Sequence, residues 1–410
     1  MHCRVCNSGD LDLVIDFGEQ PLTHVIKRLA DVPDKVFPLK VHCCVGCGLP
    51  QIVDSIDPEK LYTENDDYFT SDRAQPHAAD EAASLLSMAK GNAVIEIACN
   101  DGFFLKELRK SGVADPVGIE PNVYPADAAR ADGFKIIGAM LTPEVAHLVV
   151  KEHGKFDAVV ARGVVEHIPD LKNFFASIKI LLDEGGFLMV EVPDVSRGVA
   201  LGDCSMIFDE HISYFTDQIL SHTLLHYGFD PQLHRTYNRA GGCITIIAQS
   251  RKGCESQAGT NGSPDPVFDR DVKSYADKVE RYGKELRQTI QGFREKSFNV
   301  SFYGAGFRAC MHINGFDLAP MVDFIIDDDP CFTDCFLPGS KIPIHGRDFV
   351  GATDKPLLCL LAVGNESELK VSQNLKEVTP QEIVFSSVLS PRDIWSELAS
   401  LQEALSGVSG

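Results

Sequence analysis

Two pairs of cysteines near the start of the chain have the spacing of a metal site. Cys3 and Cys6 form one C-x-x-C knuckle, and Cys44 and Cys47 form a second. Together they can complete a tetrahedral Cys₄ site with no open position, so we predict structural zinc that supplies folding free energy to a small segment. A redox C-x-x-C is one alternative, but it should open a helix in a thioredoxin-like unit. A nucleic-acid zinc ribbon is another.

A second set of chemically capable residues surrounds a strand, a turn and a helix in the middle of the chain. Glu96 lies in the strand, and small residues form the turn, as in doubly wound folds that hold a nucleotide. The next strand ends in Glu120, whose carboxylate can accept both ribose hydroxyls. Because the turn lacks G-x-G-x-x-G, S-adenosylmethionine fits better than NAD, and an unliganded structural turn is the third alternative. The predicted cofactor contacts are Glu96, Ala98, Asn100, Asp101, Gly102, Glu120, Pro121 and Arg162.

Glu210 and His211 place a carboxylate and an imidazole side by side in a stretch flanked by aromatic residues. A histidine tuned near neutral pH can remove a proton next to a carbonyl group, and a neighbouring carboxylate can stabilise the imidazolium that forms. The pair is therefore a candidate catalytic base and its partner. A solvated Glu-His pair on a loop is the alternative.

A second glycine motif follows a predicted strand near the C-terminal end. Gly304, Gly306 and Ala309 match G-x-G-x-x-A, and Asp327 ends the next strand. The pattern suits a dinucleotide, but it also suits contact with a phosphorylated substrate or a purely structural turn. Arg308 at the helix start is a suitable diphosphate ligand.

Composition bounds the elements that must position these residues. The 410 residues suffice for two or three domains. There are 38 basic and 59 acidic side chains, and the net charge of −21 repels nucleic acid and anionic membrane surfaces. No signal peptide or long apolar segment is visible. We therefore expect a cytoplasmic monomer or weak oligomer with reduced thiols.

The hydrophobic pattern divides the chain into four segments. Residues 1–75 are rich in Cys and turn residues, which predicts a small β-rich lobe. Residues 76–252 alternate buried strands with amphipathic helices, as a doubly wound α/β domain does. Residues 253–297 contain a low-complexity loop and one long amphipathic helix over Asp269 to Glu295. Residues 298–410 return to strand and helix alternation and predict a second α/β unit.

An ordered set of motifs covers nearly the whole chain and resembles the sugar C-methyltransferases that act on keto-deoxysugar nucleotides, such as the C-3 methyltransferases of tetronitrose and kijanose biosynthesis. Besides the cysteine knuckles, the matching residues are Asp16-Phe17-Gly18, Gln20-Pro21-Leu22, Glu96-Ile97, Asn100-Asp101-Gly102, Glu120-Pro121, His167-Ile168-Pro169-Asp170, Glu191-Val192-Pro193, Glu210-His211, Ser213-Tyr214, Tyr303-Gly304-Ala305-Gly306 and Pro338 to Ile344. The resemblance implies an α/β chain with a small zinc-binding lobe, a class I Rossmann-like methyltransferase domain that binds S-adenosylmethionine, and a second Rossmann-like domain that helps to hold a nucleotide-sugar.

The same resemblance implies roles for single residues. His211 would be the base that removes the proton alpha to the C-4 ketone, with Glu210 as its partner, while His167 and Tyr68 would line the sugar pocket and hydrogen-bond the enolate oxygen. The implied substrate contacts are Phe208, Tyr214, Gly304, Gly306 and Arg308. Family members usually have Tyr where this chain has Phe208, and Phe cannot donate a hydrogen bond. Methylation at another carbon, or of a related keto substrate, is therefore an alternative. An NAD-dependent enzyme and a non-catalytic binding module are the alternatives from other classes.

Overall fold

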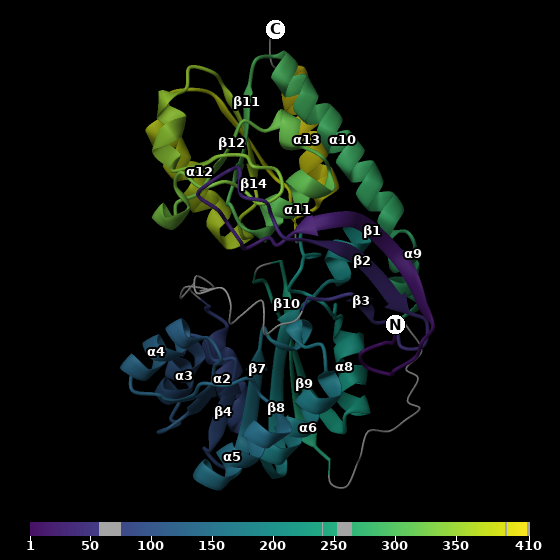
Figure 1. Cartoon of the computed structure of the whole chain (residues 1–410), viewed down its shortest axis with the longest axis vertical. Coiled ribbons are helices and arrows are strands. Elements are labelled where there is room, and N and C mark those ends of the chain that lie inside the picture. Colours follow the sequence, from purple (N-terminus) through teal and green to yellow (C-terminus); the bar gives the residue numbers. More distant parts are fainter. Residues whose placement is uncertain (57–74, 240, 252–264, 390–391, 408–410) are drawn as a thin grey trace.

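The computed structural model describes residues 1–56, 75–239, 241–251, 265–389 and 392–407. Its strands form three sheets of three, seven and five strands. Figure 1 shows a middle unit and a C-terminal unit at opposite ends of the molecule, with the strands of the N-terminal lobe lying between them. In the part of the chain that is described, no helix combines the length and the apolar character needed to cross a membrane.

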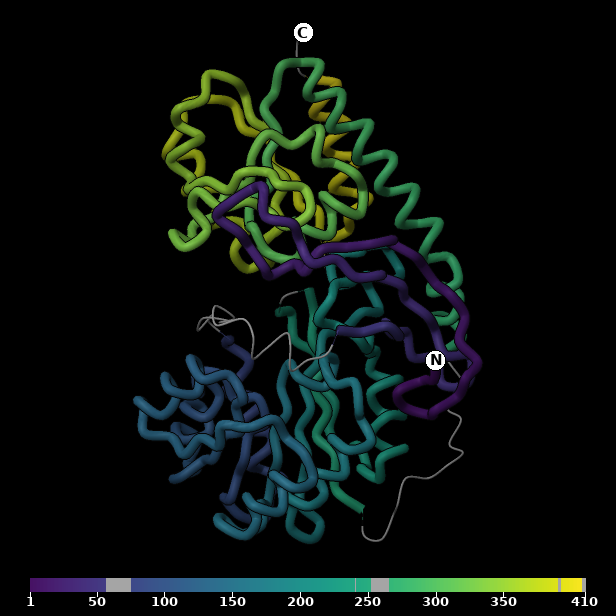
Figure 2. The backbone as a smooth tube through the Cα atoms, viewed as in Figure 1, coloured from purple at the N-terminus to yellow at the C-terminus, as the bar shows by residue number. Residues whose placement is uncertain are grey.

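The N-terminal lobe is an antiparallel sheet of β1 (Leu11–Pro21), β2 (Val36–Cys44) and β3 (Pro50–Ile52). Along β2, the buried side chains Phe37, Leu39 and Val41 alternate with more exposed ones, as expected for a strand with one face in the core. Irregular register between β1 and β2 lets this long hairpin curve across the molecule, as Figure 2 shows.

The middle unit has a seven-stranded sheet in the order β6-β5-β4-β7-β8-β10-β9. The strands from β6 to β8 are parallel, and β10 pairs antiparallel with both β8 and β9. The strands are β4 (Val94–Ile97), β5 (Val117–Ile119), β6 (Lys135–Ile137), β7 (Phe156–Arg162), β8 (Leu182–Pro193), β9 (Phe229–Tyr237) and β10 (Cys243–Ser250). The helices are α2 (Ala78–Met88), α3 (Phe103–Lys110), α4 (Val123–Ala131), α5 (Pro143–His153), α6 (Leu171–Leu181), α7 (Ser196–Leu201) and α8 (Asp217–His226), with the 3₁₀ turn η1 (Val165–His167).

Side chains that alternate along the central strands face two different cores. Ile95 and Ile97 of β4 belong to the main core, which includes residues of α5 and α6, while Val94 belongs to a second core with residues of α2 and α3. Strands buried on both faces carry near-continuous apolar runs, which is why this sheet was readable from sequence. The prediction of a doubly wound, mostly parallel sheet is confirmed.

The C-terminal unit is a parallel sheet in the order β13-β12-β11-β14-β15. Its strands are β11 (Asn299–Tyr303), β12 (Phe324–Ile326), β13 (Ile344–His345), β14 (Leu357–Leu361) and β15 (Ile383–Ser387). Its helices are α11 (Phe307–Gly315), α12 (Asn365–Val378) and α13 (Ile394–Gly407), with 3₁₀ turns η2 (Ala319–Met321), η3 (Pro330–Phe332) and η4 (Arg347–Ala352). The second α/β unit is thus present, with Rossmann-like parallel topology.

The long helix that leads into this unit is interrupted, contrary to prediction. The segment forms α9 (Pro266–Lys273) and α10 (Tyr275–Glu295), with a break at Ser274. The Ser274 hydroxyl donates to the carbonyl oxygens of Arg270 and Asp271, a local bonding pattern that competes with regular helix bonding at the break. The predicted low-complexity loop, at 253–264, lies outside the described residues.

The loop between β1 and β2 reaches the C-terminal unit. The Asp34 carboxylate lies 2.7 Å from Lys341 Nζ and accepts a hydrogen bond of 2.8 Å from the backbone N–H of Gly339. Lys27 pairs with Asp34 at 3.2 Å and forms an isolated antiparallel bridge with Phe336. We call this set of contacts the Asp34 clasp; it ties the N-terminal lobe to the C-terminal unit.

Candidate active site and metal centre

The four knuckle cysteines converge on one point. Their Sγ atoms all lie within 4.8 Å of one another, with 3.5 Å between Cys3 and Cys47 and between Cys6 and Cys44. Zinc bonded to four thiolates at about 2.3 Å would separate neighbouring sulfurs by about 3.8 Å, so the spacing and the all-sulfur donor set fit a closed zinc site. Cys43 faces the Gly48 carbonyl instead and is not one of the four.

The first cysteine knuckle is also hydrogen-bonded to the middle unit. Arg4, between the two cysteines, donates from Nη1 to the carbonyl oxygen of Ile212 at 3.0 Å, and the Ile52 backbone N–H donates to the same oxygen at 3.0 Å. The Tyr214 N–H donates to the Pro50 carbonyl. The zinc lobe therefore holds the main chain directly after His211.

The cofactor loop lies where β4 gives way to α3. Ala98 and Asn100 have positive φ values of 55° and 50°, and Gly102 at 77° begins α3. The Glu120 carboxylate shapes this loop, since it accepts hydrogen bonds of 2.9 Å from the backbone N–H groups of Asn100 and Asn122. Each carboxylate oxygen keeps acceptor capacity for a ribose hydroxyl. Asp101 and Pro121 lie in the same two turns.

Glu96 supplies a separate test of cofactor fit. Its side chain is buried, and its Oε2 has no hydrogen-bond partner among the described residues. Burial raises the pKa of Glu96 to about 8, against the opposing charge of Arg162. A buried carboxylate with an unsatisfied oxygen suits a ligand that brings a positive charge, as S-adenosylmethionine does, and the loop residues therefore fit this cofactor.

Arg162, a predicted cofactor contact, directs its donors to carboxylate and amide groups of the protein. Its Nε donates to Glu81 at 2.9 Å, and its Nη2 donates to Glu191 at 2.8 Å and to Gln75 at 2.9 Å. The side chain is buried, and its guanidinium lies 4.4 Å from the centre of the Phe104 ring. A buried guanidinium needs such partners, so Arg162 organises the carboxylates behind the cofactor loop.

The candidate catalytic histidines lie beside each other. The rings of His167, in η1, and His211 are 4.9 Å apart at 70°. His167 Nδ1 donates to the Glu210 carbonyl oxygen at 2.9 Å, which fixes its orientation. Because η1 follows β7 and the cofactor loop follows β4, neighbouring parallel strands bring both sites to one edge of the sheet.

The C-terminal unit supplies the other wall of this cluster. The Phe208 ring lies 4.3 Å from His211 and stacks on Phe307 at 4.1 Å and 14°. Phe307 and Arg308 begin α11 directly after the Gly304–Gly306 turn, so this structure brings the second glycine motif to His211, the candidate catalytic base. A side chain added at Gly306 would meet no described atom within 4 Å, which leaves open space for a ligand beside the turn.

Glu210 is not turned toward His211 as predicted. Its Oε1 lies 2.8 Å from His24 Nδ1, on the loop after β1, and Asp209 Oδ2 lies 3.5 Å from the same nitrogen. Glu210 lies in a turn and His211 in the extended segment that follows, so adjacent positions send their side chains in different directions. The sequence offered no local signal for His24, because its partners are far along the chain.

Two predicted residues of the substrate site remain, Tyr214 and Tyr68. Tyr214 is fully buried and its main chain pairs with the zinc lobe, so its position gives no support to a substrate contact. Tyr68 lies outside the described residues.

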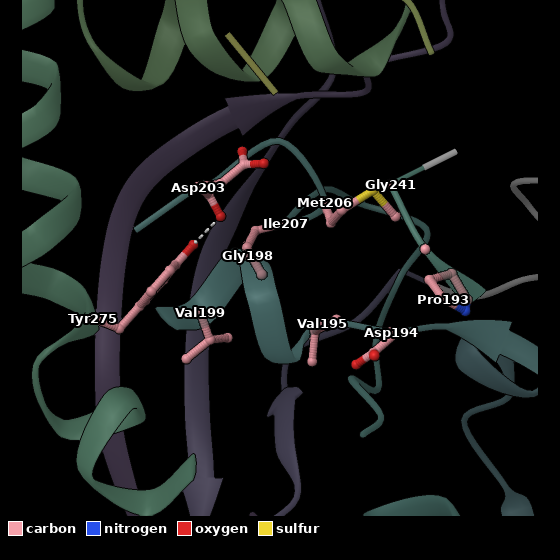
Figure 3. Close-up of a pocket in the computed structure, with 11 residues that line it drawn as sticks. Pro193, Asp194, Val195, Gly198, Val199, Asp203, Met206, Ile207, Gly241 and Tyr275 are labelled. Atoms are coloured by element: carbon pink, nitrogen blue, oxygen red, sulfur yellow. Dashed lines mark hydrogen bonds between the residues drawn. The ribbon is translucent and has the colours of Figure 1, made fainter. Parts of the chain in front are cut away.

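Figure 3 shows an apolar pocket at the end of β8, where Tyr275 donates to the Asp203 carbonyl oxygen at 3.0 Å. Its carboxylates, Asp194 and Asp203, are hydrogen-bonded within their own turns.

Three family models match the chain in succession. A zinc binding domain model matches residues 3–62, a methyltransferase domain model matches 71–234, and a C-methyltransferase C-terminal domain model matches 269–384. Each match falls on one of the three sheets described above.

Known proteins resemble the chain to different extents. C-methyltransferase NovU of Streptomyces niveus is 27% identical over 359 residues, which are 83% of this chain and 84% of NovU. The tRNA U34 carboxymethyltransferase of Pseudoalteromonas translucida (strain TAC 125) is 29% identical over 181 residues, which are 42% of this chain and 47% of that protein. Magnesium protoporphyrin IX methyltransferase from Synechocystis PCC 6803, solved with bound SAH, has a TM-score of 0.34 and 15% identity, covering 44% of this chain and 90% of that one.

The match to NovU extends across most of both chains, and the three models follow one another in the order that the motifs predicted. The chain is therefore an S-adenosylmethionine-dependent C-methyltransferase with a zinc-binding lobe.

Proposed function

We propose that this enzyme methylates the carbon alpha to the ketone of a nucleotide-linked keto-deoxysugar and that His211 removes the proton from that carbon. The observation that carries the proposal is a buried imidazole at the place where the middle unit meets the glycine turn of the C-terminal unit. C-methylation needs a carbanion, and a proton alpha to a ketone is one that an imidazole can remove.

The surroundings of His211 favour its neutral form. Burial lowers the pKa of His211 well below 6.5, and the charges of His167 and Arg308 lower it further, against a hydrogen bond to the Met206 backbone. At neutral pH the ring is then free to accept a proton. Activity should persist into more acidic solution than an exposed histidine would allow, because protonation of this base occurs only below pH 6.5.

The residues around His211 have separate roles in the proposed reaction. His167 donates from Nδ1 to the Glu210 carbonyl oxygen, and its Nε2, which lies 3.8 Å from Glu166 Oε1, would hydrogen-bond the enolate oxygen. Phe208 and Phe307 exclude water from one side of His211. Bound S-adenosylmethionine would supply the electrophilic methyl group, and its sulfur would keep the electron pair of the broken sulfur–methyl bond as neutral S-adenosylhomocysteine leaves. The proton from the carbon passes to His211, and the electron pair of that C–H bond becomes the enolate that forms the new carbon–carbon bond.

The substrate class is inferred from the C-terminal unit. Open space beside Gly306 and the guanidinium of Arg308 at the start of α11 suit a diphosphate, which arginine binds through paired N–H donors. A local positive group is needed here because the whole molecule carries a net charge of −21. A dinucleotide at this turn is the alternative, since Asp327 Oδ2, which accepts the Ala305 N–H at 2.7 Å, keeps acceptor capacity for a ribose hydroxyl.

Replacing the base tests the proposal. We expect His211→Asn to abolish both methyl transfer and solvent deuterium exchange at the alpha carbon of the substrate, with a loss of at least about 100-fold in each. The assay uses a panel of nucleotide-linked keto-deoxysugars with mass spectrometry of the product. Calorimetry should show unchanged S-adenosylmethionine binding, and His226→Asn, a half-buried histidine on α8, serves as the matched control. Retained exchange in His211→Asn would place the base elsewhere, and tight NAD binding would favour a dinucleotide in the C-terminal unit.

A further inference from the structure

We propose that His24, contributed by the zinc-binding lobe, is a positioning residue of the reaction: as a cation it holds Asp209 and Glu210 and so sets the geometry and charge around His211. This inference rests on the proposed function, in which His211 is the base. Nothing in the family matches or in the motifs assigns a role to His24.

The geometry around His24 is that of a buried ion cluster. Its Nδ1 lies 2.8 Å from Glu210 Oε1 and 3.5 Å from Asp209 Oδ2. Thr23 supports the second carboxylate, since its backbone N–H and its hydroxyl donate to Asp209 Oδ1 at 3.2 and 2.7 Å. Asp209 and Glu210 are only 1% and 5% exposed. Two carboxylates this deeply buried repel each other unless a positive group lies between them.

The charge state of His24 agrees with this arrangement. Burial by itself would lower its pKa, but the hydrogen bonds and charges of Asp209 and Glu210 outweigh that effect and raise the pKa of His24 to about 10. The histidine is therefore protonated throughout the neutral range. His24→Gln would remove one positive charge from the cluster.

The cluster acts on His211 through both shape and charge. The Glu210 carbonyl oxygen holds His167, so any shift of Glu210 moves the histidine next to the base. The groups that face His211 are His167 and Glu166 from η1, Phe208 and the Met206 backbone from its own segment, and Phe307 and Arg308 from α11. Adding an uncompensated negative charge beside these groups would stabilise the imidazolium and raise the pKa of His211.

A set of three variants tests the role. His24→Gln removes the charge but keeps a hydrogen-bond donor, His24→Lys keeps the charge, and His147→Gln changes an exposed histidine on α5 as the control. For His24→Gln we expect kcat/KM and solvent exchange at the alpha carbon to fall together by roughly 10- to 100-fold. We also expect the acidic limb of the kcat/KM profile to move to higher pH. His24→Lys should return that limb toward the wild-type position, and calorimetric S-adenosylmethionine affinity should stay unchanged in all three.

Two results would overturn the inference. One is a lower rate in His24→Gln with an acidic limb at the wild-type pH, which would mean that the residue only supports the fold. The other is a second tightly bound divalent metal in the wild-type protein, measured by elemental analysis and lost in His24→Gln, which would make the cluster a metal site.

The charge of the His24 cluster can also be tested through protein stability, independently of catalysis. His24 changes its pKa from 6.5 in the unfolded chain to about 10 in the fold, so the stability it contributes is complete below pH 6.5 and is lost as pH rises to about 10. The difference in unfolding free energy between wild type and His24→Gln should therefore shrink across that window. If this difference shrinks as expected while His211→Asn retains exchange, the cluster exists and the proposed base is wrong. A constant difference would instead refute the charged cluster itself.

Discussion

At the scale of single residues, the environment of His211 depends on an aromatic ring that cannot carry a proton. Phe208, where the family resemblance implied tyrosine, lies between His211 and Phe307. The ring contributes burial instead of a hydroxyl. Since burial is the largest cause of the lowered pKa of His211, Phe208 helps to keep this base neutral.

Truncating this ring should expose the base to water. In Phe208→Ala we expect the acidic limb of the kcat/KM profile to rise toward pH 6.5, and the free energy of unfolding to fall by about 3–5 kcal/mol, the usual cost of removing a buried aromatic ring. Phe208→Leu keeps much of the apolar volume and should shift the limb less. Identical limbs in wild type and Phe208→Ala would mean that other groups set the pKa of His211.

At the scale of elements, the seven-stranded and five-stranded sheets restrain the turns after their β4 and β11 strands by the same means. In the middle unit, Glu120 after β5 accepts from the N–H of Asn100 in the turn after β4. In the C-terminal unit, Asp327 after β12 accepts from the N–H of Ala305 in the turn after β11. A carboxylate on the neighbouring strand thus fixes the ligand-facing turn in each unit.

This correspondence offers a matched pair of variants. Glu120→Gln loses charge-assisted hydrogen bonds to the cofactor loop, so we expect S-adenosylmethionine to bind about 10- to 100-fold more weakly, as measured by calorimetry. Asp327→Asn makes the equivalent change in the other unit and should leave that affinity unchanged. Equal affinity in wild type and Glu120→Gln would show that the turn holds its shape without the carboxylate.

At the scale of the whole molecule, the zinc lobe links the other two units. Arg4, inside a knuckle, holds the carbonyl oxygen of Ile212, and the Asp34 clasp holds the C-terminal unit. Loss of the metal should therefore affect more than the lobe. It should loosen the main chain next to His211, the proposed base, without touching the cofactor loop.

Removing one zinc ligand tests this link. We expect Cys44→Ser to lower the free energy of unfolding by roughly 3 kcal/mol or more and to reduce kcat, while S-adenosylmethionine affinity is retained. Thermal unfolding, elemental zinc analysis and calorimetry provide the three measurements. Cys43→Ser changes the adjacent cysteine, which faces the Gly48 carbonyl, and should keep its zinc. An unchanged melting temperature in Cys44→Ser would contradict a structural metal.

The features that could be predicted from sequence are those with local causes. The two knuckles have a fixed spacing because each must present two thiolates to one ion. The cofactor loop is a strand, a turn and a helix contiguous in sequence, and the buried strands of a parallel sheet form short apolar runs. Family motifs added the order of the three units.

The features that were missed depend on distant residues. Glu210 is adjacent to His211 in the sequence, but its side chain meets His24. The neighbouring Asp209 likewise binds Thr23, which lies 186 residues earlier in the chain. Arg162 ends a strand beside the cofactor, but Glu81 and Glu191 from other elements take its donors. The break at Ser274 was hidden because the apolar spacing continues through α9 and α10.

The Asp34 clasp has a consequence for how the protein is made. Asp34 and its partner Gly339 are 305 residues apart, and at about 5–20 residues per second a ribosome needs roughly 15–60 s to span that interval. During this time the lobe exists without the surface it will cover, and zinc is the restraint it can acquire on its own. Metal supply during synthesis should therefore govern the yield of soluble enzyme, even when zinc is restored afterwards.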